Sequence, residues 1–248
     1  MLVKSQIKYI QSLGHKKFRD ADGVFVAEGP KIVLELLQSN NCRLVQCFAT
    51  ENWLRDSEEV LKGMEHSVFT VDEMDLKRIS FLHTPNQVVA VFTKPDFGSS
   101  SKPEGITLLL DTIQDPGNMG TILRTADWFG IPRVVCSMDT ADVFSPKVVQ
   151  SAMGSLIRVE VICLDLMEYI QSNPGSRVYA SSLTGEDLYE NIAVREGMLL
   201  IGNESRGLHP NLASIADKQI RIPRHGGAES LNVAVATGIL LSRMVQFS

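Results

Sequence analysis

Several features that mark other classes of protein are scarce in this chain of 248 residues. It has four cysteines, none of them in a CxxC pair, and five scattered histidines, so the sequence predicts neither a zinc site nor a disulfide framework. It contains no run of about 18 apolar residues, and its first residues lack the apolar core of a signal peptide. We therefore expect a cytoplasmic protein with reduced thiols and no contact with a membrane.

Common nucleotide-binding and hydrolytic motifs are also absent. There is no GxGxxG dinucleotide loop, no GxxxxGK[ST] phosphate loop and no HExxH metal motif. The formal net charge is −5, which argues against a broadly basic nucleic-acid binder. The first 31 residues are an exception, because their six basic side chains outnumber three acidic ones, a pattern compatible with contacts to RNA phosphates. The six are Lys4, Lys8, Lys16, Lys17, Arg19 and Lys31.

The overall composition is that of an ordinary globular protein, with 44% hydrophobic and 21% charged residues. One stretch stands apart, because residues 94–105 (KPDFGSSSKPEG) are rich in proline, glycine and serine. This composition is typical of a linker. We predict a first domain of residues 1–97, a linker of residues 98–104 and a second domain of residues 105–248.

Hydrophobic periodicity predicts an α/β fold in both parts. In the first part we expect a small α/β sandwich. Its helices are predicted over 4–13, 30–37, 51–61 and after Asp72, and its strands over 24–27, 44–49, 67–71 and 88–93. The second part alternates more strongly and predicts a mostly parallel sheet. Its strands are predicted over 106–110, 133–136, 156–161, 178–181, 198–202 and 219–222, and its helices over 119–129, from Pro146, over 166–171 and over 231–244.

The first motif with chemical potential is DTIQDPGNMGTILRTA, residues 111–126. It lies where a predicted strand ends and a helix begins, which is where α/β sheets bind ligands. Asn118 is predicted to cap that helix. The apolar stripe of Ile122 and Ala126 leaves Arg124 facing away from the core. An ordinary helix cap beside an exposed arginine would look similar.

Two further loops follow predicted strands. The second motif, GNESRGL at 202–208, places Glu204 between Gly202 and Gly207. The third, IPRHGGAESLNV at 222–233, enters a glycine-bearing loop, after which Ser230 is predicted to cap the last helix. Glycines allow the backbone to approach a ligand closely. Taken alone, the second motif is better explained as an ordinary glycine-containing strand-to-helix turn, and Ser230 alone would be a plain helix cap.

Taken together and in this order, the three motifs resemble the SpoU/TrmH family of RNA ribose 2′-O-methyltransferases over about residues 106–244. The segments FVAEG at 25–29 and TPNQV at 84–88 are similar to the substrate-binding domain that precedes many members. That domain resembles small ribosomal RNA-binding proteins. The loop RHGGAE at 224–229 departs from many relatives, in which it begins with small apolar or neutral residues.

The resemblance implies a SPOUT α/β fold with a deep trefoil knot, a homodimer with its site at the subunit interface, and S-adenosylmethionine as cofactor without a metal. It also implies contacts for several residues. The residues implied to bind the cofactor are Gly202, Gly207, Ile222 and Leu231. Those implied to be catalytic or to hold the site are Asn118, Arg124, Glu204, Ser230 and Asn232. Residues 145–155 match a segment that often carries substrate contacts.

The implied reaction is an in-line transfer of an activated methyl group to the 2′-oxygen of a ribose. DNA has no 2′-hydroxyl, so the reaction is specific for RNA. The family assigns the role of base to the counterpart of Arg124. A guanidinium group rarely releases its proton, so a phosphate clamp is physically easier. The expected substrate is ribosomal RNA, with transfer RNA as the alternative. A non-catalytic RNA-binding scaffold and a nucleotide-binding metabolic enzyme are the other hypotheses.

Overall fold

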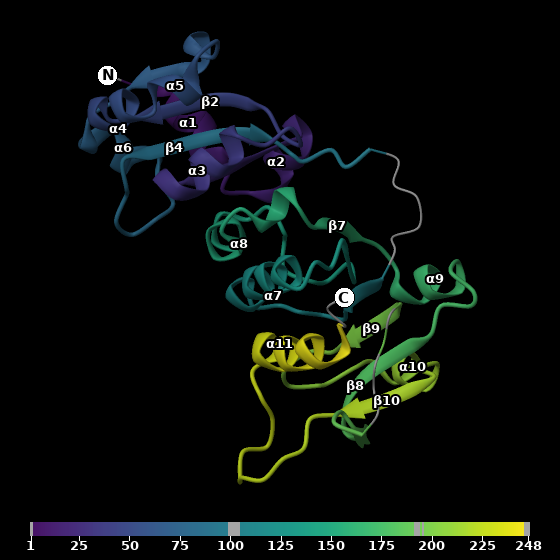
Figure 1. Ribbon diagram of the computed structural model, residues 1–248. Helices are drawn as coiled ribbons and strands as arrows, with labels where there is room; N and C mark the ends of the chain where they lie inside the picture. The colour runs from purple at the N-terminus through teal and green to yellow at the C-terminus, as the bar shows by residue number, and fades with distance from the viewer. Residues whose placement is uncertain (1, 99–104, 191–193, 195, 246–248) are drawn as a thin grey trace. The chain divides into compact units, whose positions relative to one another are not determined.

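The computed structural model describes residues 2–98, 105–190, 194 and 196–245 and divides the chain into two units (Figure 1). One unit comprises Met1–Gly98 together with Asp142–Ile157, and the other Ser99–Ala141 together with Arg158–Ser248. The predicted linker falls mostly on residues 99–104, which lie outside the described part of the chain. Residues 142–157, expected in the second domain, pack with the first unit.

The first unit is built on a four-stranded sheet in the order β1-β4-β2-β3. Antiparallel pairs join β1 to β4 and β4 to β2, and a parallel pair joins β2 to β3. The strands are β1 (Val24–Glu28), β2 (Leu44–Ala49), β3 (Val68–Thr70) and β4 (Val88–Thr93). The helices are α1 (Lys4–Ser12), α2 (Lys16–Asp22), α3 (Pro30–Leu37), α4 (Glu51–Asp56), α5 (Glu58–Leu61) and α6 (Glu73–Ile79).

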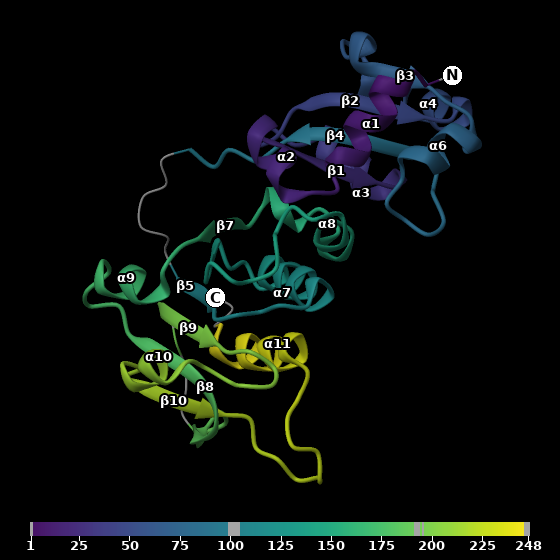
Figure 2. The same ribbon diagram turned by 180° about the vertical axis from the view of Figure 1, so that it is seen from behind.

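Both faces of this sheet are covered, as two opposite views show (Figures 1 and 2). Every residue of β1 is buried. Because side chains alternate along a strand, Val24 and Val26 join the apolar cluster that contains Ile7 and Ile10 of α1. The opposite face of β1 carries Phe25 and packs against α3 and α8 (Pro146–Ala152).

The segment 142–157 completes the first unit from a distant part of the sequence. It contains α8 and a short 3₁₀ turn at Ser155–Ile157. The Phe144 ring lies 5.5 Å from the Phe25 ring, centroid to centroid, and Asn41 donates a hydrogen bond of 2.6 Å to the Ile157 carbonyl. The apolar residues 156–157, predicted as the start of a strand, are therefore buried by packing in this unit.

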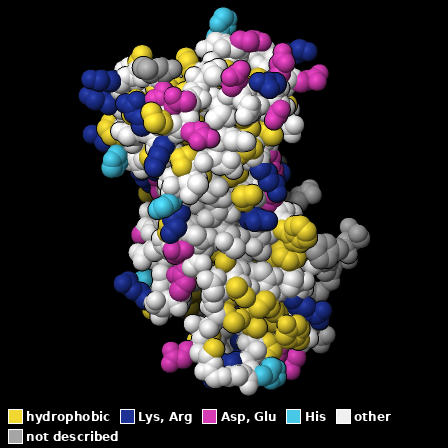
Figure 3. Space-filling model, turned by 90° about the vertical axis from the view of Figure 1, so that its left-hand side faces the viewer, with side chains coloured by type: hydrophobic (Ala, Val, Ile, Leu, Met, Phe, Trp, Pro, Cys, Tyr) yellow, Lys and Arg dark blue, Asp and Glu magenta, His cyan; other side chains and the backbone are white. Residues whose placement is uncertain are grey.

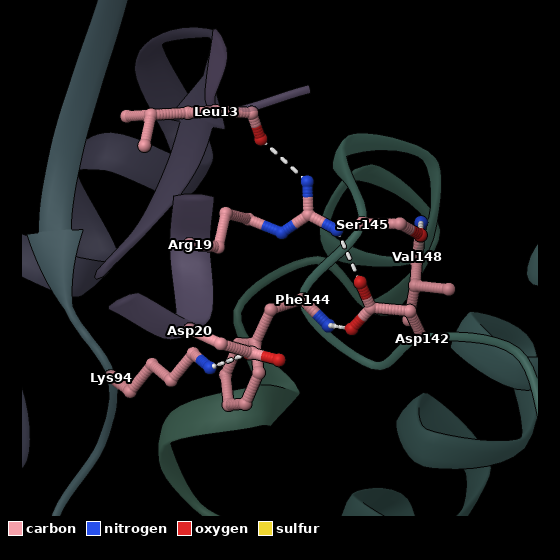
Figure 4. Close-up of polar contacts among 8 residues, drawn as sticks. All are labelled: Leu13, Arg19, Asp20, Lys94, Asp142, Phe144, Ser145 and Val148. Atoms are coloured by element: carbon pink, nitrogen blue, oxygen red, sulfur yellow. Dashed lines mark hydrogen bonds and ion pairs between the residues drawn. The ribbon is translucent and has the colours of Figure 1, made fainter. Parts of the chain in front are cut away.

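A buried ion pair lies in the same contact (Figure 4). Arg19 is only 2% exposed, donates a hydrogen bond of 2.5 Å to the Leu13 carbonyl and pairs with Asp142. Arg19 was expected among the basic groups available to RNA, and its burial removes it from that set. Lys94 lies over the Phe144 ring, 5.0 Å from its centroid.

The second unit contains a six-stranded sheet in the order β10-β8-β9-β5-β6-β7, and all neighbouring strands are parallel. Its strands are β5 (Ile106–Leu110), β6 (Arg133–Cys136), β7 (Glu160–Cys163), β8 (Val178–Asp187), β9 (Gly197–Ile201) and β10 (Lys218–Arg221). Its helices are α7 (Pro116–Trp128), α9 (Leu166–Gln171), α10 (Pro210–Ser214) and α11 (Val233–Met244). The predicted α/β class with a parallel sheet is confirmed.

The two central strands, β5 and β9, are buried along their whole length, as continuous apolar runs in a parallel sheet require. The helices α7 and α11 pack against each other, and Figures 1 and 2 show them side by side. Within the described residues, no helix has the length and apolar character needed to cross a membrane.

Two helix starts differ from the prediction. The cap of α7 is Asp115, whose carboxylate accepts a hydrogen bond from the Asn118 N–H, so the helix begins at Pro116 rather than Met119. The cap of α11 is Asn232, not Ser230, and its side chain accepts from the N–H groups of Ala234 and Val235. In both cases another good capping residue lay nearby in the sequence.

Other boundaries also moved. The strand predicted over 156–161 is β7 at Glu160–Cys163, and the helix predicted over 51–61 is divided at Ser57 into α4 and α5. The helices α2 and α10 were not predicted. Both are short, and their sequences, KKFRDAD and PNLAS, carry little helical periodicity.

Candidate active site

The three motifs meet at the side chain of Asn118. Its amide nitrogen donates a hydrogen bond of 2.7 Å to Glu204 Oε1. Its amide oxygen accepts one of 2.9 Å from Asn232 Nδ2. These residues are 86 and 114 positions away along the chain, and each comes from a different motif.

The fold explains why they meet. Asn118 lies in the first turn of α7, which follows β5, and Glu204 lies in the turn after β9. Because β5 and β9 are neighbouring parallel strands, their carboxyl ends lie at the same edge of the sheet. Asn232 is carried to this edge as the cap of α11, which packs against α7.

The turn after β9 is tightly closed. Asn203 and Gly207 exchange backbone hydrogen bonds of 2.9 and 3.0 Å, and the Asn203 Oδ1 atom accepts from the N–H groups of Ser205 and Arg206. A Cβ on Gly202 would lie 2.4 Å from the Gly207 backbone, so only glycine fits there. Gly207 itself has φ +70°, which glycine adopts without strain.

The loop between β10 and α11 lies open to solvent. All residues from 224 to 232 are exposed, and a side chain on Gly226 or Gly227 would meet no atom within 4 Å. Arg224 donates a hydrogen bond of 3.3 Å to the Ala228 carbonyl across the loop. Ile222, at the start, is half-buried, whereas Leu231, at the end, is 45% exposed.

Asn118, Glu204 and Asn232 form a hydrogen-bonded group, here called the Asn118 cluster. Two predicted residues lie outside it. Arg124 is exposed on α7, on the same helix face as Thr121 and Trp128. Ser230 is exposed two positions before Asn232. Within the described part of the chain, neither takes part in the hydrogen bonds that join Asn118, Glu204 and Asn232.

A polar layer beneath this cluster was not predicted. Asp111, at the end of β5, is 6% exposed and accepts a hydrogen bond of 2.7 Å from the His209 N–H. Asp139 accepts hydrogen bonds from the Ser137 and Thr112 hydroxyls, which lower its pKa, with a further contribution from the charge of Arg206. The aspartate that opens the first motif, directly after a strand, was the available sequence signal.

Both halves of the chain match families of known proteins. Residues 105–242 match the SpoU rRNA Methylase family, and residues 4–90 match the MRM3-like substrate binding domain. A relative from Bacillus subtilis, named 23S rRNA (guanosine(2553)-2′-O)-methyltransferase RlmP, is 32% identical over 95% of this chain and 94% of its own.

Solved structures show the same fold over nearly the whole chain. A protein from Porphyromonas gingivalis, described as an RNA methyltransferase of the TrmH family, is 43% identical, with a TM-score of 0.83 over 98% of both chains. An AdoMet-bound rRNA methyltransferase from Sinorhizobium meliloti is 31% identical, with a TM-score of 0.86 over 98% of this chain and 95% of the other. The chain therefore belongs to the SpoU rRNA methylase family.

Proposed function

We propose that this SpoU-family methyltransferase transfers a methyl group from S-adenosylmethionine to a ribose 2′-hydroxyl of ribosomal RNA. The observation that carries the proposal is the double hydrogen bond of Asn118, which joins three distant motifs in one site. The Bacillus relative is named for the same reaction on 23S rRNA, and the Sinorhizobium structure is described as AdoMet-bound.

The loops at this edge of the sheet fit such a cofactor. An adenosyl group is commonly bound through exposed peptide groups, and the glycines of the loop after β10 leave open space beside the backbone. Gly202, Gly207, Ile222 and Leu231 are the residues that would hold it. S-Adenosylmethionine supplies a methyl group already activated on a sulfonium centre.

The remaining task of the protein is to position the RNA. The exposed guanidinium of Arg124 is suited to a two-point contact with an RNA phosphate, which would aim the neighbouring ribose oxygen. Asn118 holds Glu204 and the start of α11 in fixed positions. Ser230, two residues before that helix cap, is available to RNA or cofactor.

We propose that residues 1–97 bind RNA. The five lysines of the basic N-terminal set (Lys4, Lys8, Lys16, Lys17 and Lys31) are all exposed. Lysines at the surface attract the phosphate backbone without reading sequence. The match to a substrate-binding domain over residues 4–90 supports this role, and α8, with the exposed Lys147, adds to the same unit.

We propose that the enzyme is a homodimer. Trp128 on α7 is 82% exposed, and Val235 on α11 is 51% exposed. Figure 3 shows hydrophobic side chains gathered in the lower part of the view. Large exposed apolar groups on two packed helices are typical of a protein interface, and a second copy burying them would lie beside Arg124.

We also propose the trefoil knot and a cytoplasmic location. After β10, at one edge of the sheet, the chain returns to the middle, where Asn232 reaches Asn118 and α11 packs against α7. Threading of this return through the preceding loops would form the knot. The location follows from the proposed ribosomal substrate, since the Bacillus relative is named for a reaction on 23S rRNA.

A direct test uses ribosomal RNA from cells that lack the gene. The purified chain is incubated with this RNA and labelled S-adenosylmethionine, and the modified nucleotide is mapped against RNA from cells that express the protein. We expect one methylated ribose, resistant to alkaline cleavage. Cofactor binding without transfer to any RNA would favour a non-catalytic scaffold, and transfer to base atoms would exclude the proposed reaction.

A further inference from the structure

Thr112, directly after β5, has a backbone conformation that is rare for its residue type. Its φ is +58°, in the left-handed region. For a β-branched residue this conformation is strained. Strain of this kind persists only where surrounding contacts enforce it, and it is concentrated at functional sites.

The contacts that enforce it come from the ends of three strands. The Thr112 N–H donates a hydrogen bond of 2.8 Å to Ser137 Oγ, after β6. The Thr112 carbonyl accepts one of 2.8 Å from Asn203 Nδ2, after β9. The hydroxyl lies 2.9 Å from Asp111 Oδ1 and 3.0 Å from Asp139 Oδ2.

The hydroxyl has one hydrogen to share between two carboxylates. Asp111 is held from its other oxygen by the His209 N–H, and Asp139 by the Ser137 hydroxyl. Both carboxylates are therefore fixed independently, and the threonine side chain is held between them. This arrangement anchors the side chain while the left-handed backbone turns the carbonyl toward Asn203.

The carbonyl contact extends to the site. With its amide nitrogen on Thr112, Asn203 presents Oδ1 to the N–H groups of Ser205 and Arg206, at 2.9 and 3.1 Å. These bonds shape the turn of residues 203–207. Glu204 in that turn accepts the hydrogen bond of Asn118.

We propose that Thr112 is a positioning residue for methyl transfer, whose strained backbone fixes the 203–207 turn and, through it, Glu204. The inference rests on the proposed function for its catalytic readout. The structural part of the proposal does not depend on that function. The Thr112 hydroxyl holds the left-handed backbone in place, and the Thr112 carbonyl then keeps the turn of residues 203–207 ordered through its bond with Asn203.

Three substitutions separate the hydroxyl from the backbone conformation. Thr112→Val keeps the shape but removes the anchor, so the strained backbone is expected to relax and the carbonyl to leave Asn203. Thr112→Ser keeps the anchor. Thr112→Gly lacks the hydroxyl but adopts a left-handed conformation freely. Thr184→Val, on an exposed part of β8, is the matched control.

The KM for S-adenosylmethionine and kcat are measured on ribosomal RNA, and amide hydrogen exchange is followed at Ser205, Arg206 and Gly207 without ligand. We expect Thr112→Val to raise KM and to accelerate exchange about tenfold, with a smaller change in kcat. Serine and glycine are expected to restore both readouts to near wild type. Wild-type exchange in the valine variant, or a glycine variant as impaired as the valine variant, would overturn the proposal.

A variant at Asn203 keeps the test informative if Thr112→Val fails to fold. Asn203→Asp loses the donor to Thr112 but keeps the oxygen that accepts from Ser205 and Arg206. It is expected to reproduce the faster exchange and the raised KM, and unchanged exchange in this variant also counts against the inference. If the wild-type chain methylates no RNA, the proposed function fails, whereas the exchange measurements still decide the role of Thr112.

Discussion

Asn118 uses both ends of its carboxamide, donating to Glu204 and accepting from Asn232. Only an amide side chain offers a donor and an acceptor side by side in this way. A carboxylate of the same size could still accept from Asn232 but would face the carboxylate of Glu204. The residue type at this position therefore follows from its two partners, and the pair of bonds predicts how a substitution behaves.

For Asn118→Asp we expect kcat/KM to fall by about a hundredfold at neutral pH, because a donor to a charged group is lost and like charges oppose each other. Protonation of the new aspartate side chain restores a donor, so the ratio of variant to wild-type activity should rise as the pH falls. Rate profiles against pH measure this ratio. Asn211→Asp, exposed on α10, is the control. A ratio independent of pH would contradict the assigned bonds.

Arg124 makes a different prediction, since it is exposed and lies outside the Asn118 cluster. Arg124→Ala should reduce kcat on the order of a hundredfold, with thermal stability and S-adenosylmethionine affinity unchanged. Arg124→Lys should recover little, because lysine lacks the two-point fork. Calorimetry with the cofactor and single-turnover kinetics separate the effects. Arg177→Ala is the control, because Arg177 lies directly before β8, at the amino-terminal ends of the strands and away from Asn118. Equal activity in all variants would exclude the proposed phosphate contact.

At the level of elements, continuous apolar runs predicted the central strands well. Strand β5 matches its predicted bounds because a buried strand in a parallel sheet reads as a near-continuous apolar run. Strand β6 and helix α9 also match theirs. The start of α7 was missed because Asp115 and Asn118 are both good caps, and only the fold selects between them. The segment 156–157 was mistaken for a strand because its burial comes from a tertiary contact.

The site was predictable in its residues but not in its connections. Asn118, Glu204 and Asn232 could be named from motif resemblance, yet nothing in spacings of 86 and 114 residues indicates a direct bond. Thr112 was invisible in the sequence because threonine gives no signal of a left-handed backbone. Arg19 was misassigned to the surface, since a lone arginine is rarely buried without a partner, and its partner lies 123 positions away.

The end of β1 and the turn after α6 are joined by Glu28, which accepts hydrogen bonds from the Ser80 hydroxyl and the Phe81 N–H. Burial raises the pKa of this carboxyl despite those bonds. The folded chain then binds the proton more tightly than the unfolded chain. The free energy of unfolding should therefore fall as the pH rises from the ordinary glutamate pKa through the raised one.

We predict that Glu28→Gln removes this part of the pH dependence. As the pH rises above 4.5, the ordinary glutamate pKa, the thermal midpoint of the variant should decline less than that of wild type. Thermal unfolding in matched buffers measures the difference. Glu59→Gln, exposed on α5, should follow the wild-type curve. A Glu28→Gln curve parallel to wild type would show that burial does not control this carboxyl.

For the whole molecule, the chain leaves the second unit at residue 142 and returns at residue 158. The intervening segment belongs structurally to the proposed RNA-binding unit. Its apolar residues Val148 and Val149 are buried there, and Asp142 neutralises the buried guanidinium of Arg19. The halves of the sequence are thus joined by packing as well as by the peptide between residues 98 and 105.

This joining predicts the outcome of a cut. With a protease site inserted between residues 98 and 105, the two fragments should remain associated after cleavage and elute together from a sizing column.

Asp142→Ala leaves Arg19 buried without its partner, at a cost of about 3 kcal/mol, and should release the fragments. Asp20→Ala removes only the more exposed pair with Lys94, also drawn in Figure 4, worth about 1 kcal/mol or less. The Asp20→Ala fragments should therefore stay together. Separation of the unsubstituted fragments would mean that residues 142–157 do not hold the first unit, and deletion of residues 1–97 would then leave the methyltransferase half undisturbed.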